Sequence, residues 1–357
     1  MGELTQLAEA AEAWRADGVA AALATVVAVR GSAYRREGAK MLLGPGQRMH
    51  GTLSGGCLEP ELLVAAEEVL ASGRGRTLEY DLSEETMWGL GIGCGGQVRV
   101  QVAPLDPALP EVWRRVESQG EAWAVVTPLE GRGAVLVGPG EEGPAQGALA
   151  DEAWTRAAEA AGRARLAGVR PGIEALPQGD VFVDVMAPPP LLCLFGAGHD
   201  AVPVAALAQR TGFRVRVIDP RPAYATAERF PGAEVVVADV RTDPATADLA
   251  PAGSFAVVMH HHLERDTAAL ERLASGRSRY VGALGPRSRT ERMLADLEGR
   301  GVDTAYLRRV LASPVGLDIG AEGAEAIAVA VVAELLALRA GRAGGRLATA
   351  DGTIHAR

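Results

Sequence analysis

The chain has 357 residues, a length typical of two domains, and 48% of them are hydrophobic, enough to build sizeable cores. A net charge of −9 disfavours nonspecific binding to nucleic acid or to a membrane surface. Three cysteines, no secretory signal and no uncharged apolar stretch of membrane-spanning length predict a cytoplasmic protein without disulfides, with neither nucleic acid nor membrane as a partner.

The N-terminal half alternates short apolar runs with a few helical patterns. An amphipathic helix is expected in the first 20 residues, and the GPG at 44–46 predicts a hairpin turn. This mixture predicts a smaller α+β domain over residues 1–187, of which 104–187 carry little recognisable pattern. Strands are predicted at 22–29, 41–43, 77–82, 97–103, 122–127, 134–137 and 182–186, and helices at 61–71 and 111–119.

The C-terminal half has the alternation of strands and helices that is typical of α/β proteins. Pro188–Pro190 cannot lie inside a helix or a central strand and therefore mark the domain boundary. A Rossmann-type, doubly wound parallel sheet is predicted over 188–340, followed by a mobile tail at 341–357. Strands are predicted at 191–195, 214–218, 234–237, 254–259 and 279–282, and helices at 201–210, 266–275, 288–299 and 322–339.

The segment after the first of these strands carries the G-x-G-x-x-A form of the dinucleotide fingerprint. Gly196 permits the tight turn, Gly198 lets a pyrophosphate approach the backbone, and Ala201 keeps the helix close to the strand. Asp219 ends the next strand, where it is placed to accept a hydrogen bond from a ribose hydroxyl. His199 lies inside the loop as a further candidate contact. The alternative is a turn of Rossmann shape that binds no nucleotide.

Two cysteines lie in glycine-rich loops of the N-terminal domain. Cys57 follows Gly55 and Gly56 and precedes a helix, a setting that favours the thiolate. Cys94 precedes Gly95 in a similar loop, so both thiols are candidate ligands for a soft metal. The alternative is that each is a small buried apolar residue. Cys193 lies among leucines in a predicted strand and is expected in the core.

Other candidate residues lie at the carboxyl edge of the predicted parallel sheet and near the N-terminus. Of the histidine run 260–262, His262 is favoured as a ligand contact over a zinc site, because no third metal ligand is nearby. Gly316 and Asp318 are a candidate ligand wall before the last helix. Arg30, Arg35, Arg36 and Lys40 form either an anion site or a solvated basic face.

The motifs together resemble the XdhC/CoxI family, the accessory factors of xanthine dehydrogenase and related molybdenum hydroxylases. The resemblance covers 20–103, through GSAYRREGAKML, GTLSGGCLE and GCGG, and 190–340, through FGAGHDAVPVA, VIDPR, YVGALGPRSR and PVGLDIGA. Cys57 and Cys94 are at the positions of the family's cysteines. His262 and Asp266 match the family's pattern after the fourth strand, whereas His260 and His261 do not.

The resemblance implies a molybdenum-cofactor (molybdopterin) chaperone rather than a stand-alone catalyst. Such a protein protects the cofactor during sulfuration by a cysteine desulfurase and delivers it to an apo molybdenum hydroxylase. A homodimer is expected, because symmetric dimers are the commonest assembly. The alternative is an NAD(P)-dependent oxidoreductase that uses the loop at 196–201 and takes an acid or base from the histidine run. That alternative leaves Cys57 and Cys94 unexplained.

Overall fold

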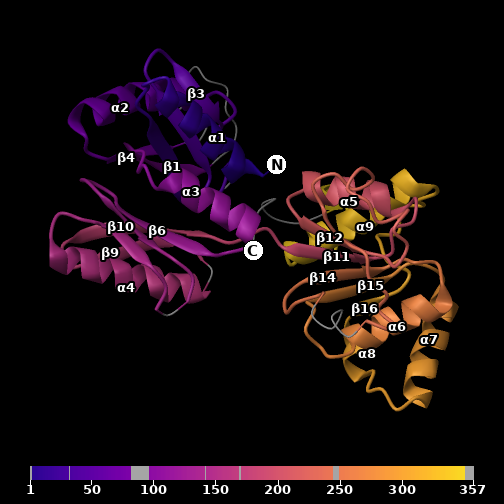
Figure 1. Cartoon of the computed structure of the whole chain (residues 1–357). Coiled ribbons are helices and arrows are strands. Elements are labelled where there is room, and N and C mark those ends of the chain that lie inside the picture. Colours follow the sequence, from indigo (N-terminus) through magenta and orange to yellow (C-terminus); the bar gives the residue numbers. More distant parts are fainter. Residues whose placement is uncertain are drawn as a thin grey trace. The chain divides into compact units, whose positions relative to one another are not determined.

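The computed structural model describes residues 2–31, 33–81, 96–140, 142–168, 170–243 and 249–349. The chain divides after Pro188 into two compact units, the second of which is Pro189–Thr349. Figure 1 shows the first unit in indigo to magenta and the second in warmer tones that end in yellow. The division falls inside the triple-proline segment, whose fixed φ angles and missing N–H groups keep it out of helices and central strands.

The first unit begins with a five-stranded antiparallel sheet of order β3-β2-β1-β5-β4. Helix α2 covers one face, where Leu62, Ala66 and Val69 pack against Val26 and Val100 of the sheet. Helices α1 and α3 contact each other and contribute the fully buried Leu7 and Trp113. The elements are α1 (Glu3–Ala16), β1 (Ala22–Arg30), β2 (Lys40–Gly44), β3 (Arg48–Gly51), α2 (Glu59–Ser72), β4 (Arg76–Asp81), β5 (Gln97–Pro104) and α3 (Leu109–Arg114).

A second five-stranded antiparallel sheet, of order β8-β7-β6-β10-β9, is formed by residues whose sequence carries little recognisable pattern. Helix α4 packs closely on it, because a Cβ at Gly162 would lie 2.9 Å from the Val137 side chain and 3.0 Å from that of Val126. The elements are β6 (Trp123–Pro128), β7 (Ala134–Val137), β8 (Ala145–Ala148), α4 (Glu152–Gly168), β9 (Gly172–Leu176) and β10 (Gly179–Met186).

A buried ion pair joins the two sheets of this unit. Nζ of Lys40, on β2, lies 2.7 Å from Oδ2 of Asp184, on β10, and the side chains are only 5% and 9% exposed. Lys40 also donates to the carbonyl of Gly38, and the side-chain amide of Gln101 donates to the carbonyl of Pro128. These polar groups border a cavity of about 240 Å³. Lys40, the chain's only lysine, is therefore not part of a solvated basic face.

The second unit is built on a six-stranded sheet of order β13-β12-β11-β14-β15-β16, in which every paired neighbour is parallel. Strand order reverses between β11 and β14, as in doubly wound sheets, so the predicted fold class is confirmed. The strands are β11 (Leu191–Phe195), β12 (Arg214–Ile218), β13 (Glu234–Val236), β14 (Phe255–Val258), β15 (Tyr280–Ala283) and β16 (Leu311–Ala312).

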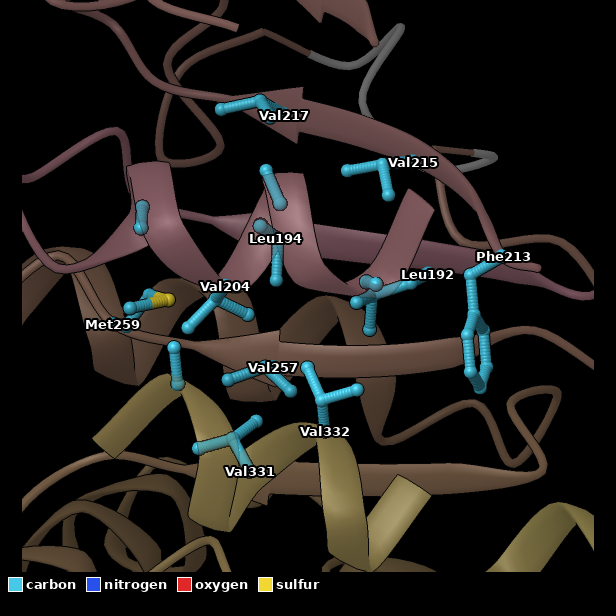
Figure 2. Close-up of a cluster of buried hydrophobic side chains, with 14 of the residues drawn as sticks. Leu192, Leu194, Val204, Phe213, Val215, Val217, Val257, Met259, Val331 and Val332 are labelled. Carbon is cyan, nitrogen blue, oxygen red and sulfur yellow. The ribbon is translucent and has the colours of Figure 1, made fainter. Parts of the chain in front are cut away.

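Helices cover both faces of this sheet (Figure 1). Figure 2 shows one face, where Val204 of the first helix and Val331 of the last pack over Leu194 and Val257. No helix in the described ranges is long and apolar enough to cross a membrane. The helices are α5 (Ala201–Arg210) and α9 (Ala324–Arg339) on that face, and α6 (Leu263–Leu273), α7 (Arg287–Gly299) and α8 (Ala305–Val310) on the other.

Several segments differ from the sequence-based prediction. The predicted helix at 111–119 is split into α3 and a π-helical segment, Arg115–Gln119. Helix α4 is absent from the prediction, because its Ala- and Arg-rich sequence has few large apolar side chains. Strand β8 consists of small exposed residues, and α8 and β16 are too short for a periodic signal. Of the expected tail, 341–349 are described and include a 3₁₀ turn, Leu347–Thr349.

Candidate functional site

The glycine-rich loop lies between β11 and α5, at the carboxyl edge of the parallel sheet. Gly196 has φ +128°, and a Cβ there would lie 2.6 Å from the carbonyl carbon and oxygen of Met259. Only glycine therefore fits between this loop and the end of β14. Ala201 is fully buried at the start of α5, which holds the helix against the sheet. His199 is exposed on the loop.

The segment after β14 closes over this loop from the neighbouring strand. His261 has φ +58°, and its Nε2 lies 2.6 Å from Oδ2 of Asp200, the residue that precedes α5. A Cβ at Gly198 would meet only side-chain atoms, the nearest being Oδ1 of Asp200 at 2.7 Å. Because strand order reverses between β11 and β14, these two loops border the crevice where open α/β sheets bind ligands.

Asp219, the expected acceptor for a ribose hydroxyl, is fully buried and engaged within the chain. Its Oδ2 accepts from the N–H of Ala197 at 2.8 Å and from Nη2 of Arg221 at 2.7 Å. Its Oδ1 accepts from the backbone N–H and the Nε of Arg221, at 2.9 and 2.8 Å. Burial raises the pKa of Asp219, but these hydrogen bonds outweigh burial and leave the pKa below the ordinary value. The carboxylate thus ties the glycine-rich loop to Arg221.

Two arginines and a tyrosine lie together next to the glycine-rich loop. The Arg221 guanidinium lies over the Tyr224 ring, 4.1 Å from its centroid, and that of Arg229 is 5.0 Å from the same centroid. Arg229 donates to the carbonyls of Ala197 at 2.8 Å and Tyr224 at 2.6 Å. The His199 ring meets Tyr224 edge-on, with the centroids 6.3 Å apart. The sequence reasoning singled out neither arginine, although Arg221 lies two residues after the predicted Asp219.

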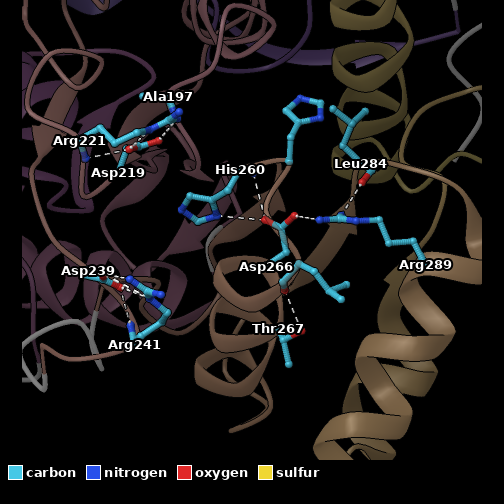
Figure 3. A network of polar contacts seen from close by, with 12 residues as sticks. Ala197, Asp219, Arg221, Asp239, Arg241, His260, Asp266, Thr267, Leu284 and Arg289 are labelled. Carbon is cyan, nitrogen blue, oxygen red and sulfur yellow. Dashed lines mark hydrogen bonds and ion pairs between the residues drawn. The ribbon is translucent and has the colours of Figure 1, made fainter.

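A buried histidine network follows β14 (Figure 3). Nδ1 of His260 is 3.0 Å from Oδ1 of Asp266, whose Oδ2 accepts from Arg289 at 2.5 Å. Burial raises the pKa of Asp266, but hydrogen bonds from His260 and Arg289 outweigh burial and leave the pKa below the ordinary value. The ionised carboxylate only accepts, so Nδ1 carries the proton. Nε2 of His260 is buried and has no hydrogen-bond partner within the described ranges.

His262, the histidine favoured from the sequence, is exposed, and its carbonyl accepts from the N–H of Asp266 in the first turn of α6. The buried member of the run is His260 instead, because the chain leaves the strand geometry at His261. Gly316 has φ +109° and donates to Glu334 on α9 at 2.7 Å, whereas Asp318 is exposed. The Gly316 loop is thereby fixed to the last helix.

In the first unit, the loop that carries Cys57 is folded around Glu59. Oε1 of Glu59 accepts from the Thr52 hydroxyl and from the N–H groups of Leu53 and Ser54, at 3.1 to 3.3 Å. Its Oε2 accepts from the Ser54 hydroxyl and from the N–H groups of Gly56 and Leu58. Burial raises the pKa of Glu59, but these hydrogen bonds outweigh burial and lower the pKa to about 2. The sequence reasoning missed Glu59, although it lies two residues after Cys57.

Cys57 is half-buried at the top of this loop, and its N–H donates to the Ser54 hydroxyl at 3.0 Å. Gly55 and Gly56 have φ angles of +77° and +116°, and nothing lies within 4 Å of a Cβ built on either, so the space beside Cys57 is open. The sequence led us to expect that free N–H groups favour a Cys57 thiolate. Two of these groups, those of Gly56 and Leu58, donate hydrogen bonds to Glu59 instead.

Cys94 and Gly95 lie outside the described residues. Among the residues that are described, no three His, Cys, Asp or Glu side chains are placed to hold a metal ion. Cys193 is fully buried, as expected; burial raises the pKa of its thiol to about 12.

Substitutions at the two loop glycines are expected to have different effects. Gly196→Ala is expected to cost about 1–3 kcal/mol of stability, because its Cβ meets backbone atoms that cannot move aside. The Cβ of Gly198→Val meets only side-chain atoms, those of Asp200 and His261, so the fold should survive while the new side chain blocks phosphate approach. Thermal unfolding and titration with phosphorylated pterins and nucleotides check both results. Full affinity of Gly198→Val for every ligand tested would show that this loop is not the binding loop.

Comparisons with known proteins agree for both units. Two family models match, one described as the XdhC and CoxI family at 14–81 and one as the XdhC Rossmann domain at 192–335. The chain is 34% identical over 330 residues, 89% of this chain and 93% of the relative, to a Bacillus subtilis (strain 168) protein named as a probable xanthine dehydrogenase subunit. It is 28% identical to the Escherichia coli (strain K12) protein named molybdenum cofactor insertion chaperone PaoD, over 90% of this chain and 84% of that protein.

A solved structure is similar over the whole chain. The crystal structure of a Bacillus halodurans protein described as a xanthine dehydrogenase matches with a TM-score of 0.75 and 30% identity, and the match covers 98% of each chain. Together with the glycine-rich loop on a doubly wound sheet and the Cys57 loop, these matches show that the chain belongs to the XdhC and CoxI family.

Proposed function

We propose that this protein binds a molybdenum cofactor as cargo and inserts it into a xanthine dehydrogenase-type molybdenum hydroxylase. The observation that carries the proposal is the Cys57 loop. A half-buried thiol stands beside open space left by Gly55 and Gly56, on a loop that Glu59 holds in one shape. Thiolate is a soft ligand and suits a soft metal such as molybdenum held by dithiolene sulfur. The names of the Bacillus and Escherichia relatives support the same conclusion.

The finer parts of the proposal concern the handling of the cofactor. Cys57 and Cys94 contact the cofactor and shield it while a cysteine desulfurase adds sulfur, and the loaded protein then delivers it to the apo-hydroxylase. The Rossmann unit, considered by itself, binds a phosphate-bearing ligand through the loop from Gly196 to Ala201, with Asp219 acting through Arg221. His199, His262, Gly316 and Asp318 stay proposed as contacts, and the protein acts as a homodimer.

Cysteine variants test this function. Cys57→Ala is expected to lower the molybdenum retained by the purified protein and the activity of the served hydroxylase, because the soft ligand is lost while few packing contacts change. Cys94→Ala should have a similar or smaller effect. Cys193→Ala is the matched control, since it removes a buried thiol and should affect stability alone. Bound molybdenum and hydroxylase activity are measured for all three.

The Cys57 and Cys94 double variant provides the result that would contradict the proposal. Normal molybdenum retention in the Cys57 and Cys94 double variant would contradict the proposed site. A second candidate function, an NAD(P)-dependent oxidoreductase, would then lead. One observation favours it: His260, held by Asp266, is a histidine of the kind used in acid–base catalysis at the carboxyl edge of the sheet. Against it, Asp219 is already fully engaged by the chain, and Cys57 has no role.

A further inference from the structure

The strongest unexplained feature of the Rossmann unit is that Asp219 has no capacity left for a ribose hydroxyl. A carboxylate offers about four lone-pair positions. Those of Asp219 accept from the Ala197 N–H and from the backbone N–H, Nε and Nη2 of Arg221, all within 2.9 Å. A ribose diol would have to displace one of these donors from a fully buried side chain. A ligand recognised only by its diol therefore gains little here.

The Arg221 side chain, in contrast, is fixed in position and still has N–H groups available for a ligand. Asp219 holds the Nε and Nη2 edge of its guanidinium, and the Tyr224 ring lies 4.1 Å from its central carbon. A guanidinium has five N–H donors, and this pair uses two of them. The side chain is 33% exposed, so a ligand can approach it from solvent. Both its position and its orientation are fixed in advance, which lowers the entropic cost of binding.

Arg229 adds positive charge to the same place. Its side chain donates to the carbonyls of Ala197, Gly198 and Tyr224, and within the described part of the chain it forms no ion pair. Ala197 is thus held on both sides, by its N–H to Asp219 and by its carbonyl to Arg229. The glycine-rich loop therefore has two guanidinium groups beside it and two carboxylates: Asp219 is buried between the loop and Arg221, and Asp200, at the end of the loop, is paired with His261.

We propose that Arg221 and Arg229 select a ligand that bears a phosphate monoester beside the glycine-rich loop, and reject one that offers only a ribose diol. This inference rests on the proposed function, in which the loop binds a phosphate-bearing ligand. A planar guanidinium matches phosphate oxygens in a bidentate arrangement, and a monoester carries up to two negative charges. Such a group occurs either at the end of a pterin cofactor or on the ribose of a phosphorylated nucleotide.

A matched pair of nucleotides tests the selection. Adenosine 2′,5′-bisphosphate and 5′-AMP share the 5′-phosphate, which the glycine-rich loop can hold in both, and differ only at the ribose, where a 2′-phosphate monoester replaces one hydroxyl of the diol. In calorimetric titrations the wild-type protein is expected to bind the bisphosphate about tenfold more tightly than AMP, the effect of one charge-assisted contact. Arg221→Ala removes that contact and frees Asp219, so it should abolish the preference and leave AMP binding unchanged or tighter. Equal binding of both nucleotides by the wild type, or an unchanged preference in Arg221→Ala, contradicts selection on a nucleotide.

The chain supplies its own control. Arg241 pairs with Asp239 through the same Asp-x-Arg arrangement, with Nη2 to Oδ2 at 2.7 Å, and contacts neither Tyr224 nor the glycine-rich loop in any described interaction. Figure 3 shows both pairs in one view. Arg241→Ala removes an ion pair of the same Asp-x-Arg geometry, on a carboxylate that is 22% exposed, and should leave the nucleotide preference as in the wild type. A loss of preference in Arg241→Ala as well would assign the effect to stability instead of recognition.

A second experiment tests whether the phosphate monoester belongs to the pterin cofactor and not to a nucleotide. The molybdenum and the pterin that copurify with wild type, Arg221→Ala and Arg241→Ala are measured after cells are grown with molybdate. Loss of pterin in Arg221→Ala alone, without nucleotide binding by the wild type, assigns the monoester to the cofactor. If neither nucleotide preference nor pterin retention depends on Arg221, the selection proposed here is wrong. The proposed function then still stands provided that Cys57→Ala loses molybdenum, so the two failures are separable.

Discussion

Asp184→Ala is expected to lower the free energy of unfolding of the first unit by about 3–5 kcal/mol, because it leaves the Lys40 ammonium buried without its counter-charge. Lys40→Ala should lower the free energy of unfolding by a similar amount, because it leaves the Asp184 carboxylate buried without its counter-charge. The pair joins β2 of one sheet to β10 of the other, so its loss removes a link between the two sheets. Urea unfolding of each variant measures the effect.

A double variant separates the pair from simple packing. Lys40→Met with Asp184→Leu removes both charges and fills the space, and should recover most of the stability lost by either single change. Glu152→Ala is the control, since it breaks the exposed Glu152–Arg156 pair and should cost less than about 1 kcal/mol. If Asp184→Ala and Lys40→Ala lower the free energy of unfolding no more than Glu152→Ala does, the Lys40–Asp184 pair does not stabilise the unit.

The sequence predicts the second unit well because its signals are local and periodic. Apolar runs such as Leu191–Phe195 mark buried parallel strands, and Gly196 marks a turn that only glycine permits. The first unit is harder to predict, because β8 and β9 are short strands without a fully buried residue and α4 is an Ala-rich helix with few large apolar side chains. Their positions are decided by tertiary packing, which a local pattern does not show.

The site shows the same limit. The sequence identifies Asp219 and Cys57 from their positions after a strand and before a helix. It does not show that Arg221 occupies the Asp219 carboxylate or that Glu59 gathers the N–H groups around Cys57, because both depend on side-chain directions. Nor does it show that His260 is the buried histidine of its run, because the left-handed conformation of His261 breaks the alternation of a strand.

Glu59→Gln is expected to change both the pH dependence of stability and the behaviour of the Cys57 loop. The pKa of Glu59 is about 2 in the folded protein and 4.5 ordinarily. A lowered pKa stabilises the folded state fully above pH 4.5, and the contribution falls as pH decreases toward 2. The difference corresponds to about 3 kcal/mol at neutral pH, of which about half is lost by pH 3. The neutral amide of Gln cannot titrate and cannot accept from all the loop donors.

Urea unfolding at pH 7 and pH 3 measures the first effect: wild type should lose more stability than Glu59→Gln between the two pH values. Glu67→Gln, an exposed position on the same helix, should follow the wild type. The rate at which iodoacetamide alkylates Cys57 at pH 7 measures the second effect. Because the Glu59 carboxylate accepts from the N–H groups of Gly56 and Leu58, Glu59→Gln should loosen the loop and raise this rate. An unchanged rate would mean that the loop keeps its shape without the Glu59 carboxylate.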